Sequence, residues 1–161
     1  MPLLLLTNLT KLIFFNTNVA DLSPLAKLTT LEIIDFSYTR VENLAPLQKL
    51  PKLMKLDFTG TPIKSMEILK NLTNLKYLYF LKTKISDLTP IAQLFNLVEI
   101  GLSERPDSDI IILHKLTNLR HLRLDDPLAQ NDQISQISLQ CQLSTLKKCL
   151  PNLFIYQCSR R

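Results

Sequence analysis

The chain has 161 residues, 46% of them hydrophobic, and a formal net charge of +5 at pH 7. It contains two glycines, too few for a glycine-rich phosphate-binding loop, and no apolar run of the roughly 18 residues that a membrane-spanning helix requires. This length and apolar content are sufficient for one folded domain with its own core. We therefore treat residues 1–161 as a single domain and expect no membrane span.

One apolar pattern returns every 22 residues, in copies that begin at Leu6, Leu28, Leu50, Leu72, Leu94 and Leu116. Counted from each of these leucines, positions 4, 7 and 9 carry large apolar side chains in every copy, and positions 14 and 20 do so in most. Position 9 of the first four copies holds Phe14, Phe36, Phe58 and Phe80, which we expect to form a continuous row. So small a unit must bury these residues against its neighbours, as in a leucine-rich repeat.

The first half of each copy predicts a short strand that ends in a turn. The step of two from position 7 to position 9 points both side chains towards the core. Position 12 then carries threonine in the first four copies, at Thr17, Thr39, Thr61 and Thr83. Their hydroxyl groups can satisfy backbone groups left open where the strand turns away, which predicts a buried threonine ladder. In the alternative interpretation they are β-branched strand ends in solvent.

The second half of each copy predicts a single helical turn. Position 16 carries residue types that accept hydrogen bonds from free amides at a helix start, namely Asp21, Asn43, Ser65, Asp87 and Asp109. In three copies a proline follows three residues later, where the first helical turn tolerates it. The chain is therefore predicted to be an α/β leucine-rich-repeat right-handed solenoid. Its curved parallel sheet would form the concave face, and short 3₁₀ or α turns would form the convex face.

The end of the chain departs from the repeat. Arg105 and Pro127 replace the threonine of position 12, and Asp107 replaces the aliphatic residue of position 14, so irregular turns are expected. The next leading leucine is Leu150, 34 residues after Leu116, which indicates an inserted element.

That insertion predicts a C-terminal cap formed by residues 132–161. Residues 133–149 have apolar side chains at three- and four-residue spacing and lack glycine and proline. This pattern favours an amphipathic helix with Asn131 or Asp132 as its N-cap. A last strand is expected at 153–156, and helix and strand together would cover the open end of the sheet.

The other end of the predicted solenoid is a run of leucines, residues 3–6, with no cap before it. A bare apolar end is prone to association. Either the chain is cut from a longer repeat array, or this end self-associates with a second copy; the sequence leaves both open. The first six residues have no basic start and no small-residue cleavage site, so we expect no signal peptide.

The three cysteines, Cys141, Cys149 and Cys158, lie in the predicted cap. The first two would be about two helical turns apart, too far along the axis for a disulfide. Free thiols favour a reducing compartment, and the odd count without a CxxC pair argues against zinc. We expect no cofactor or metal, and a cytoplasmic protein or one exported by a route without a cleavable signal peptide.

Neither catalysis nor nucleic-acid binding is predicted. His114 falls on the outer side and His121 on the concave side, so they cannot share a ligand, and no Ser-His-Asp spacing, HExxH or P-loop occurs. Many lysines recur at outer or turn positions, and no stripe of basic and base-stacking aromatic residues fills one face. The net charge alone therefore does not indicate a nucleic-acid partner.

A family resemblance rests on two units, LTNLTKLIFFNTNVADLSPLAK and LTNLKYLYFLKTKISDLTPIAQ. They resemble the 22-residue repeats of internalin-type bacterial leucine-rich repeat proteins in the LTNL start and the (I/V)xDL(S/T)P end, over residues 6–115 and more loosely to 137. The resemblance implies protein binding through the concave sheet, as a bacterial interaction protein or effector. Internalins differ in carrying an export signal, an N-terminal cap and asparagine at position 12. Similar repeats occur in intracellular phosphatase regulators, so a regulatory subunit of an enzyme is an alternative.

Strand side chains that point away from the core, at positions 6, 8, 10 and 11, should line the concave face. Nothing in the core demands the apolar residues among them, so we expect exposed side chains centred on Tyr77 and Tyr79, which is typical of protein interfaces. In the alternative they pack against one another without a partner. The predicted protein-binding residues are Lys11, Phe15, Ile33, Asp35, Tyr38, Lys55, Asp57, Tyr77, Tyr79, Leu81, Lys82, His121 and Arg123.

Two carboxylates of this set, Asp35 and Asp57, should be neighbours on adjacent strands, near Lys11 and Lys55. A carboxylate pair can indicate catalysis, but an open face offers no water-excluded pocket that would shift the pKa values. We expect charge pairing with the lysines instead.

Overall fold

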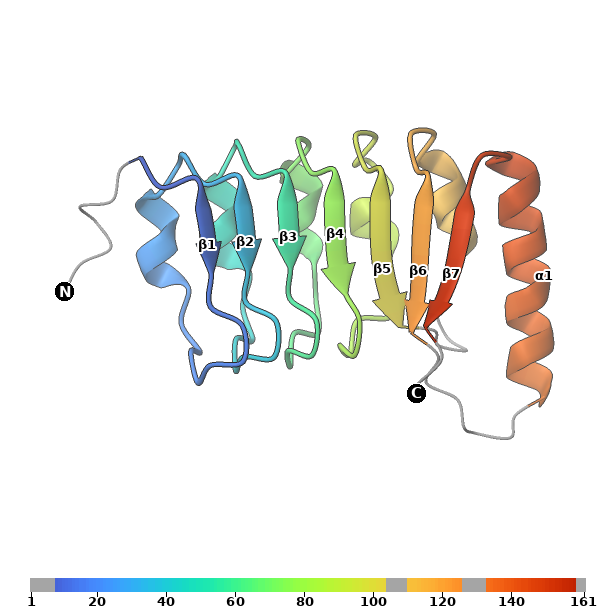
Figure 1. Cartoon of the computed structure of the whole chain (residues 1–161), viewed down its shortest axis with the longest axis horizontal. Coiled ribbons are helices and arrows are strands. Elements are labelled where there is room, and N and C mark those ends of the chain that lie inside the picture. Colours follow the sequence, from blue (N-terminus) through green and yellow to red (C-terminus); the bar gives the residue numbers. More distant parts are fainter. Residues whose placement is uncertain (1–7, 104–109, 126–132, 159–161) are drawn as a thin grey trace.

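The computed structural model describes residues 8–103, 110–125 and 133–158, with the backbone alone at 133–139 and 157–158. One parallel sheet holds seven strands in sequence order (Figure 1). The strands are β1 Lys11–Ile13, β2 Ile33–Asp35, β3 Lys55–Asp57, β4 Tyr77–Phe80, β5 Glu99–Ser103, β6 His121–Asp125 and β7 Phe154–Cys158. Parallel strands joined through segments on one side of a sheet form right-handed crossovers. The predicted α/β leucine-rich-repeat right-handed solenoid is confirmed.

Short 3₁₀ segments make these crossovers. They are η2 Ser23–Lys27, η3 Ala45–Lys49, η4 Glu67–Asn71, η5 Thr89–Ile91 and η6 Ile110–Lys115. In Figure 1 they lie behind the sheet, which leaves the other face of the strands open. We call the open face the concave face and one strand with its following 3₁₀ segment a coil.

Position 16 caps these segments as predicted, with a shift of one residue. Asp21 Oδ1 accepts the backbone amide of Ser23 at 2.8 Å, and Asn43 Oδ1 accepts that of Ala45 at 2.8 Å. The residue directly before each of these four 3₁₀ segments is a leucine or a methionine, which makes no side-chain capping hydrogen bond. The position-16 side chain therefore accepts a hydrogen bond from the amide of the residue two places later. The leucine between them is needed in the core and cannot act as the cap.

A continuous phenylalanine row runs through the first four coils, as the sequence predicts. The rings of Phe14, Phe36, Phe58 and Phe80 stack with centroids 6.0, 6.1 and 5.8 Å apart and interplanar angles of 19°, 17° and 16°. Phe36 and Phe58 are fully buried, whereas Phe14 in the first described coil is only partly buried. Burying one such side chain stabilises the fold by about 1.5–3 kcal/mol.

The threonines of position 12 form the buried ladder that was expected. Thr39, Thr61 and Thr83 are at most 5% exposed. Each hydroxyl donates to the carbonyl oxygen of the phenylalanine three residues earlier, at 2.8, 2.7 and 2.8 Å. Thr17 makes the same bond at 2.8 Å but is exposed. The bonds run within each coil, so the threonines close the turn after the strand and do not link one coil to the next.

Asparagines provide a link between coils that the sequence analysis did not assign. The side-chain amides of Asn74, Asn96 and Asn118 each donate to the carbonyl oxygen 23 residues earlier, at 2.8, 2.9 and 2.8 Å. All three stand at position 3 of their copies, in the recurring LTN or LFN. The available signal was their 22-residue spacing, which places like side chains beside like carbonyls in a stack.

The C-terminal cap forms at the predicted place. Helix α1 covers Gln133–Cys149, buries Leu143 and Leu146, and packs against η6 at the end of the stack (Figure 1). The last strand was expected at 153–156; β7 starts one residue later and reaches Cys158 in parallel pairing with β6. Leu153 stays outside the strand as the buried end of the preceding turn, where its amide donates to Leu150 at 3.0 Å.

Some expectations concern residues outside the described ranges and remain predictions. They are the N-cap at Asn131 or Asp132, the leucine run 3–6, the capping role of Asp109, and the irregular turns around Arg105, Asp107 and Pro127.

Thr61→Val should lower the free energy of unfolding by about 1–3 kcal/mol. The change keeps the side-chain shape but removes the hydroxyl that donates to the buried Phe58 carbonyl oxygen. Urea denaturation followed by circular dichroism would measure it. Thr17→Val removes the same bond at an exposed site and should cost much less. Equal losses in the two variants would contradict the role assigned to burial.

Candidate binding face

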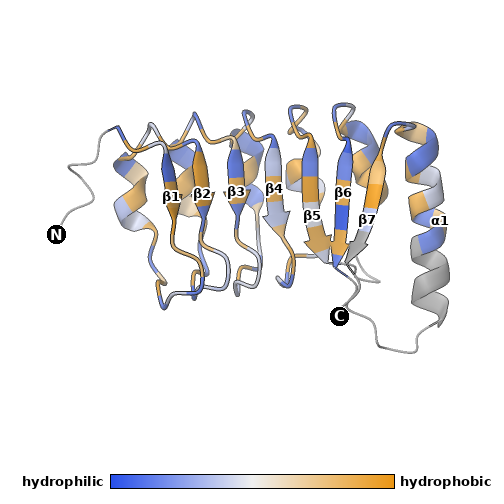
Figure 2. Cartoon of the chain, in the orientation of Figure 1, coloured by the Kyte–Doolittle hydropathy of each residue, from blue (hydrophilic) through white to orange (hydrophobic). Residues whose placement is uncertain are grey.

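The strand register brings the predicted concave-face residues into rows across the sheet. One row runs Lys11, Ile33, Lys55, Tyr77, Glu99, His121 and Phe154. The next runs Ile13, Asp35, Asp57, Tyr79, Gly101, Arg123 and Tyr156. Each predicted strand residue therefore lies beside its counterparts in neighbouring coils. Figure 2 shows the hydropathy of each residue along the strands, with β2 largely apolar and β6 largely hydrophilic.

The predicted exposure holds for some aromatic residues and fails for others. Phe15, Tyr38 and Tyr77 are 57%, 49% and 38% exposed. Tyr79 and Leu81, which were expected to be exposed, are only partly so. The reason is Gly101 on the neighbouring strand, because the space that a side chain would fill there is occupied by these two residues.

The Tyr79 ring lies over Gly101. A Cβ atom at Gly101 would lie 2.8 Å from Tyr79 Cδ1 and 2.9 Å from Leu81 Cδ1, closer than real Cβ contacts allow. Two cations flank the ring: Lys55 Nζ lies 5.4 Å and Arg123 Cζ 5.7 Å from its centroid. Burial raises the pKa of the Tyr79 phenol well above its ordinary value, and the Glu99 carboxylate adds to the shift.

The Tyr38 ring lies over Gly60 in the same way. A Cβ atom at Gly60 would lie 2.6 Å from Tyr38 Cδ1. Lys82 Nζ lies 5.7 Å from the Tyr38 ring centroid and 3.4 Å from its hydroxyl. Gly60 has φ +69°, and Asn16, Tyr38 and Lys82 adopt φ +54° at the same position of their coils. The left-handed backbone alone therefore does not demand glycine here, and the Tyr38 ring supplies the additional reason.

The expected pairing of Asp35 and Asp57 with lysines forms no ion pair among the described residues. Asp35 Oδ1 accepts the amide and hydroxyl of Ser37 at 3.0 and 2.7 Å, and Asp57 Oδ1 accepts the amide of Thr59 at 3.0 Å. These bonds close the ends of the two strands locally, and no ion pair joins either carboxylate to Lys11 or Lys55. Burial raises the pKa of Asp57 above its ordinary value, and the hydrogen bond and, more weakly, the Lys55 ammonium oppose the shift.

Arg123 forms an ion pair on the described part of the concave face. Its Nε contacts Oε1 of Glu99, which is only 12% exposed on its side chain, while Arg123 is half exposed. Sequence spacing did not pair them, because Glu99 and Arg123 stand at different positions of successive copies. The diagonal contact across β5 and β6 exists because Gly101, the residue directly beside Arg123, has no side chain to intervene.

An aromatic stack at the C-terminal end of the face was missed. The His121 ring stacks on those of Phe154 and Tyr156, with both centroids 5.8 Å away, and the Tyr156 hydroxyl is 3.2 Å from His121 Nδ1. Phe154 and Tyr156 are 62% and 47% exposed. Because β7 was interpreted only as part of the cap, these residues were not assigned to the face. Their alternation, Phe154 and Tyr156 outward with Ile155 between, was the available signal.

Features elsewhere do not add a second site. The described residues contain no group of three or more His, Cys, Asp or Glu arranged for a metal ion, and no helix there is long and apolar enough to cross a bilayer. His114 Nδ1 lies 2.7 Å from the Ile111 carbonyl oxygen on the outer side, away from His121. Cys141 and Cys149 are free and exposed. The side chain of Cys158 lies outside the described part.

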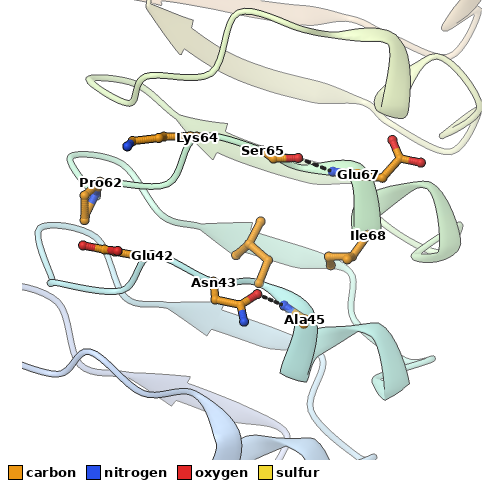
Figure 3. A pocket seen from close by; sticks show the side chains of 9 residues that line it. Glu42, Asn43, Ala45, Pro62, Lys64, Ser65, Glu67 and Ile68 are labelled. Carbon is orange, nitrogen blue, oxygen red and sulfur yellow. Dashed lines mark hydrogen bonds between the residues drawn. The ribbon is translucent and has the colours of Figure 1, made fainter.

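A shallow hollow of about 240 Å³ lies between the second and third coils, away from the concave face (Figure 3). Its polar groups include Asn43, whose side chain accepts the Ala45 amide, and Ser65, which accepts the Glu67 amide at 3.4 Å. These groups serve the 3₁₀ starts, and none of the predicted binding residues lines the hollow. The concave face therefore carries the candidate site.

Comparisons with known proteins agree on the fold. The family profile described as "Leucine Rich repeats (2 copies)" matches residues 7–49. A search of curated proteins gives no match. An internalin (inlF) of Listeria monocytogenes is 23% identical, with TM-score 0.66 over 94% of this chain and 48% of that chain. A Leptospira interrogans leucine-rich repeat protein is 22% identical, with TM-score 0.71 over 94% of this chain and 38% of that chain.

A third solved structure, an internalin C2 of Listeria monocytogenes, is 24% identical, with TM-score 0.65 over 96% of this chain and 74% of that chain. The chain spans about half the length of the first of these structures. At these identities the likeness concerns the fold, which is a leucine-rich repeat solenoid with repeats that resemble those of internalins.

Raising the pH above the ordinary tyrosine pKa of about 10 should destabilise the native state through Tyr79. Its pKa is raised in the folded chain, so the folded state holds the phenol proton more tightly than the unfolded state. The free energy of unfolding therefore keeps this contribution of Tyr79 in full below about pH 10 and loses it as the pH rises further. Urea denaturation of the wild type and Tyr79→Phe would test this, since the variant should lose less stability between about pH 8 and pH 11. Equal losses would contradict it.

Proposed function

We propose that this leucine-rich repeat protein is a non-enzymatic module that binds a partner protein on its concave face. Leucine-rich repeat folds commonly serve as interaction modules, and the internalins and the Leptospira protein share this fold. The proposal rests on the chemistry of the exposed strand residues, because a fold alone does not specify a function.

The observation that carries the proposal is the set of exposed aromatic side chains along one rigid sheet. Tyr38, Tyr77, Phe154 and Tyr156 are each more than a third exposed, and all four stand on or beside strands of the open face. Aromatic side chains of this kind dominate the binding energy of protein interfaces. Hydrogen-bonded strands lose little conformational freedom when a partner binds, so less of the contact energy is offset by ordering.

Local interactions hold several of these rings in place before any partner arrives. Tyr156 stacks on His121, and Tyr38 lies over Gly60 with Lys82 beside it. In the alternative interpretation the side chains only cover one another. The remaining exposure of Phe154, at 62%, and of Tyr156, at 47%, favours a surface that still has apolar area to bury.

The double variant Tyr77→Ala/Tyr156→Ala should weaken partner binding at least tenfold while changing the melting temperature little. Losing interface aromatics typically costs about 2 kcal/mol or more in binding, whereas both residues are too exposed to support the core. Affinity capture would identify a partner, and calorimetry with the purified partner would give the Kd values.

Phe95→Ala is the matched control, since Phe95 is 56% exposed but lies on a turn outside the concave strands. It should leave the Kd unchanged. A partner that binds the double variant as tightly as the wild type, or that is lost on Phe95→Ala, would place the binding surface elsewhere.

A second candidate function is self-association through β1. Within the described residues β1 pairs only with β2 and has no strand on its other side. Ile13 and Phe15 are 44% and 57% exposed there, and Leu12 and Phe14 are only partly buried. An open sheet edge with apolar residues is a template for pairing with another chain.

Light scattering after size-exclusion chromatography tests this candidate over a range of protein concentrations. A dimer that becomes a monomer on Phe15→Asp, but persists on Phe95→Asp, would support pairing through β1. A monomer at every concentration would exclude it.

A further inference from the structure

Both glycines of the chain lie beneath tyrosine rings on the concave face. Gly60 lies under Tyr38 and Gly101 under Tyr79, each in the coil that follows the tyrosine. Any other residue at either position would place a Cβ atom within 3 Å of the ring. The glycines therefore determine how the two tyrosines lie along the face, which makes them positioning residues of the binding surface.

The rings of Tyr38 and Tyr79 each also have a cation from another coil beside them. Lys82 reaches Tyr38 from two coils away. Lys55 approaches Tyr79 from the preceding coil, and Arg123 approaches it from two coils further on. A cation over an aromatic face is attracted by the negative charge of the ring face. We call Tyr38, Lys55, Tyr79, Lys82 and Arg123 the tyrosine–cation patch. Its three cations project from one open surface that spans β3 to β6.

Three described carboxylates near the patch are already engaged. Asp35 and Asp57 accept hydrogen bonds from the ends of their own strands, and Glu99 pairs with Arg123. No ion pair with a described carboxylate neutralises Lys55 or Lys82. Both ammonium groups are therefore held on aromatic rings with capacity left for an anion, since each carries three donors.

We propose that the tyrosine–cation patch binds an acidic segment of the partner protein, with carboxylates on Lys55 and Lys82 and apolar groups on the tyrosine rings. The inference rests on the proposed function and adds the chemistry of the partner. Charge complementarity carries it: Asp35, Asp57 and Glu99 are engaged within the fold. Lys55 and Lys82 make no ion pair with a described carboxylate and are left to pair with a partner.

A random copolymer of glutamate and tyrosine is a suitable probe, because it offers carboxylates and apolar rings without a defined sequence. Fluorescence anisotropy of the labelled copolymer should show binding to the wild type that weakens with added salt. Lys55→Gln/Lys82→Gln should weaken it about tenfold, the scale expected for two exposed charge-assisted contacts. A copolymer of lysine and tyrosine should not bind.

Lys64→Gln/Lys84→Gln is the matched control, because it lowers the net charge by the same two units at exposed residues outside the strands. It should bind the acidic copolymer like the wild type. Gly101→Ala keeps every charge but displaces the Tyr79 ring, and it should also weaken binding while the circular dichroism spectrum stays native.

Equal weakening in both lysine double variants would overturn the proposal, because it indicates bulk charge alone. Binding of single-stranded polyuridine as tight as that of the acidic copolymer would overturn it as well. An absence of copolymer binding would also overturn it. The proposed function is tested apart from this, since a partner whose binding depends on Tyr77 and Tyr156 would sustain it even if the acidic copolymer did not bind.

Discussion

Burial of apolar side chains between neighbouring coils is the interaction on which the molecule depends. A coil of 22 residues is one layer thick, so side chains such as Leu56 and Phe58 become fully buried only because coils on both sides cover them. The phenylalanine row shows this dependence directly: the rings lose all exposure in the middle coils and keep part of it in the first described coil. Stability is therefore shared among coils and belongs to none of them alone.

The same packing determines the geometry of the concave face. Because the core fixes the register of each strand on the next, residues at equal positions in successive coils lie side by side. The Tyr79 ring can rest over Gly101 only because Gly101 occupies the equivalent position in the following coil. Surface contacts of this kind follow from core register, and a shift of one residue would separate every one of them.

The core of this fold was predictable from sequence, because the same apolar residue types recur at the same spacing in successive copies. The leading leucines, the phenylalanine row, the buried threonines and helix α1 all follow from spacing and apolarity. The asparagine bonds were also periodic, but a side-chain amide at a turn has many partners available, and sequence does not say which carbonyl oxygen lies opposite. Asp35 illustrates a different limit, since its choice between a nearby lysine and its own strand end depends on distances of a few ångströms. The exposure of Tyr79 and Leu81 was predicted wrongly, because the space that they fill is left by Gly101 on another strand.

The left-handed position after each strand has a consequence for how such a protein can change over time. Four different residues, Asn16, Tyr38, Gly60 and Lys82, adopt this backbone conformation, and the strands before them pair in one register. Mutation can therefore rewrite the outward chemistry of a coil without disturbing its interior. Chains built on this plan can therefore differ widely in sequence while retaining one architecture, which accords with solved structures that superimpose at TM-scores of 0.65–0.71 despite 22–24% identity.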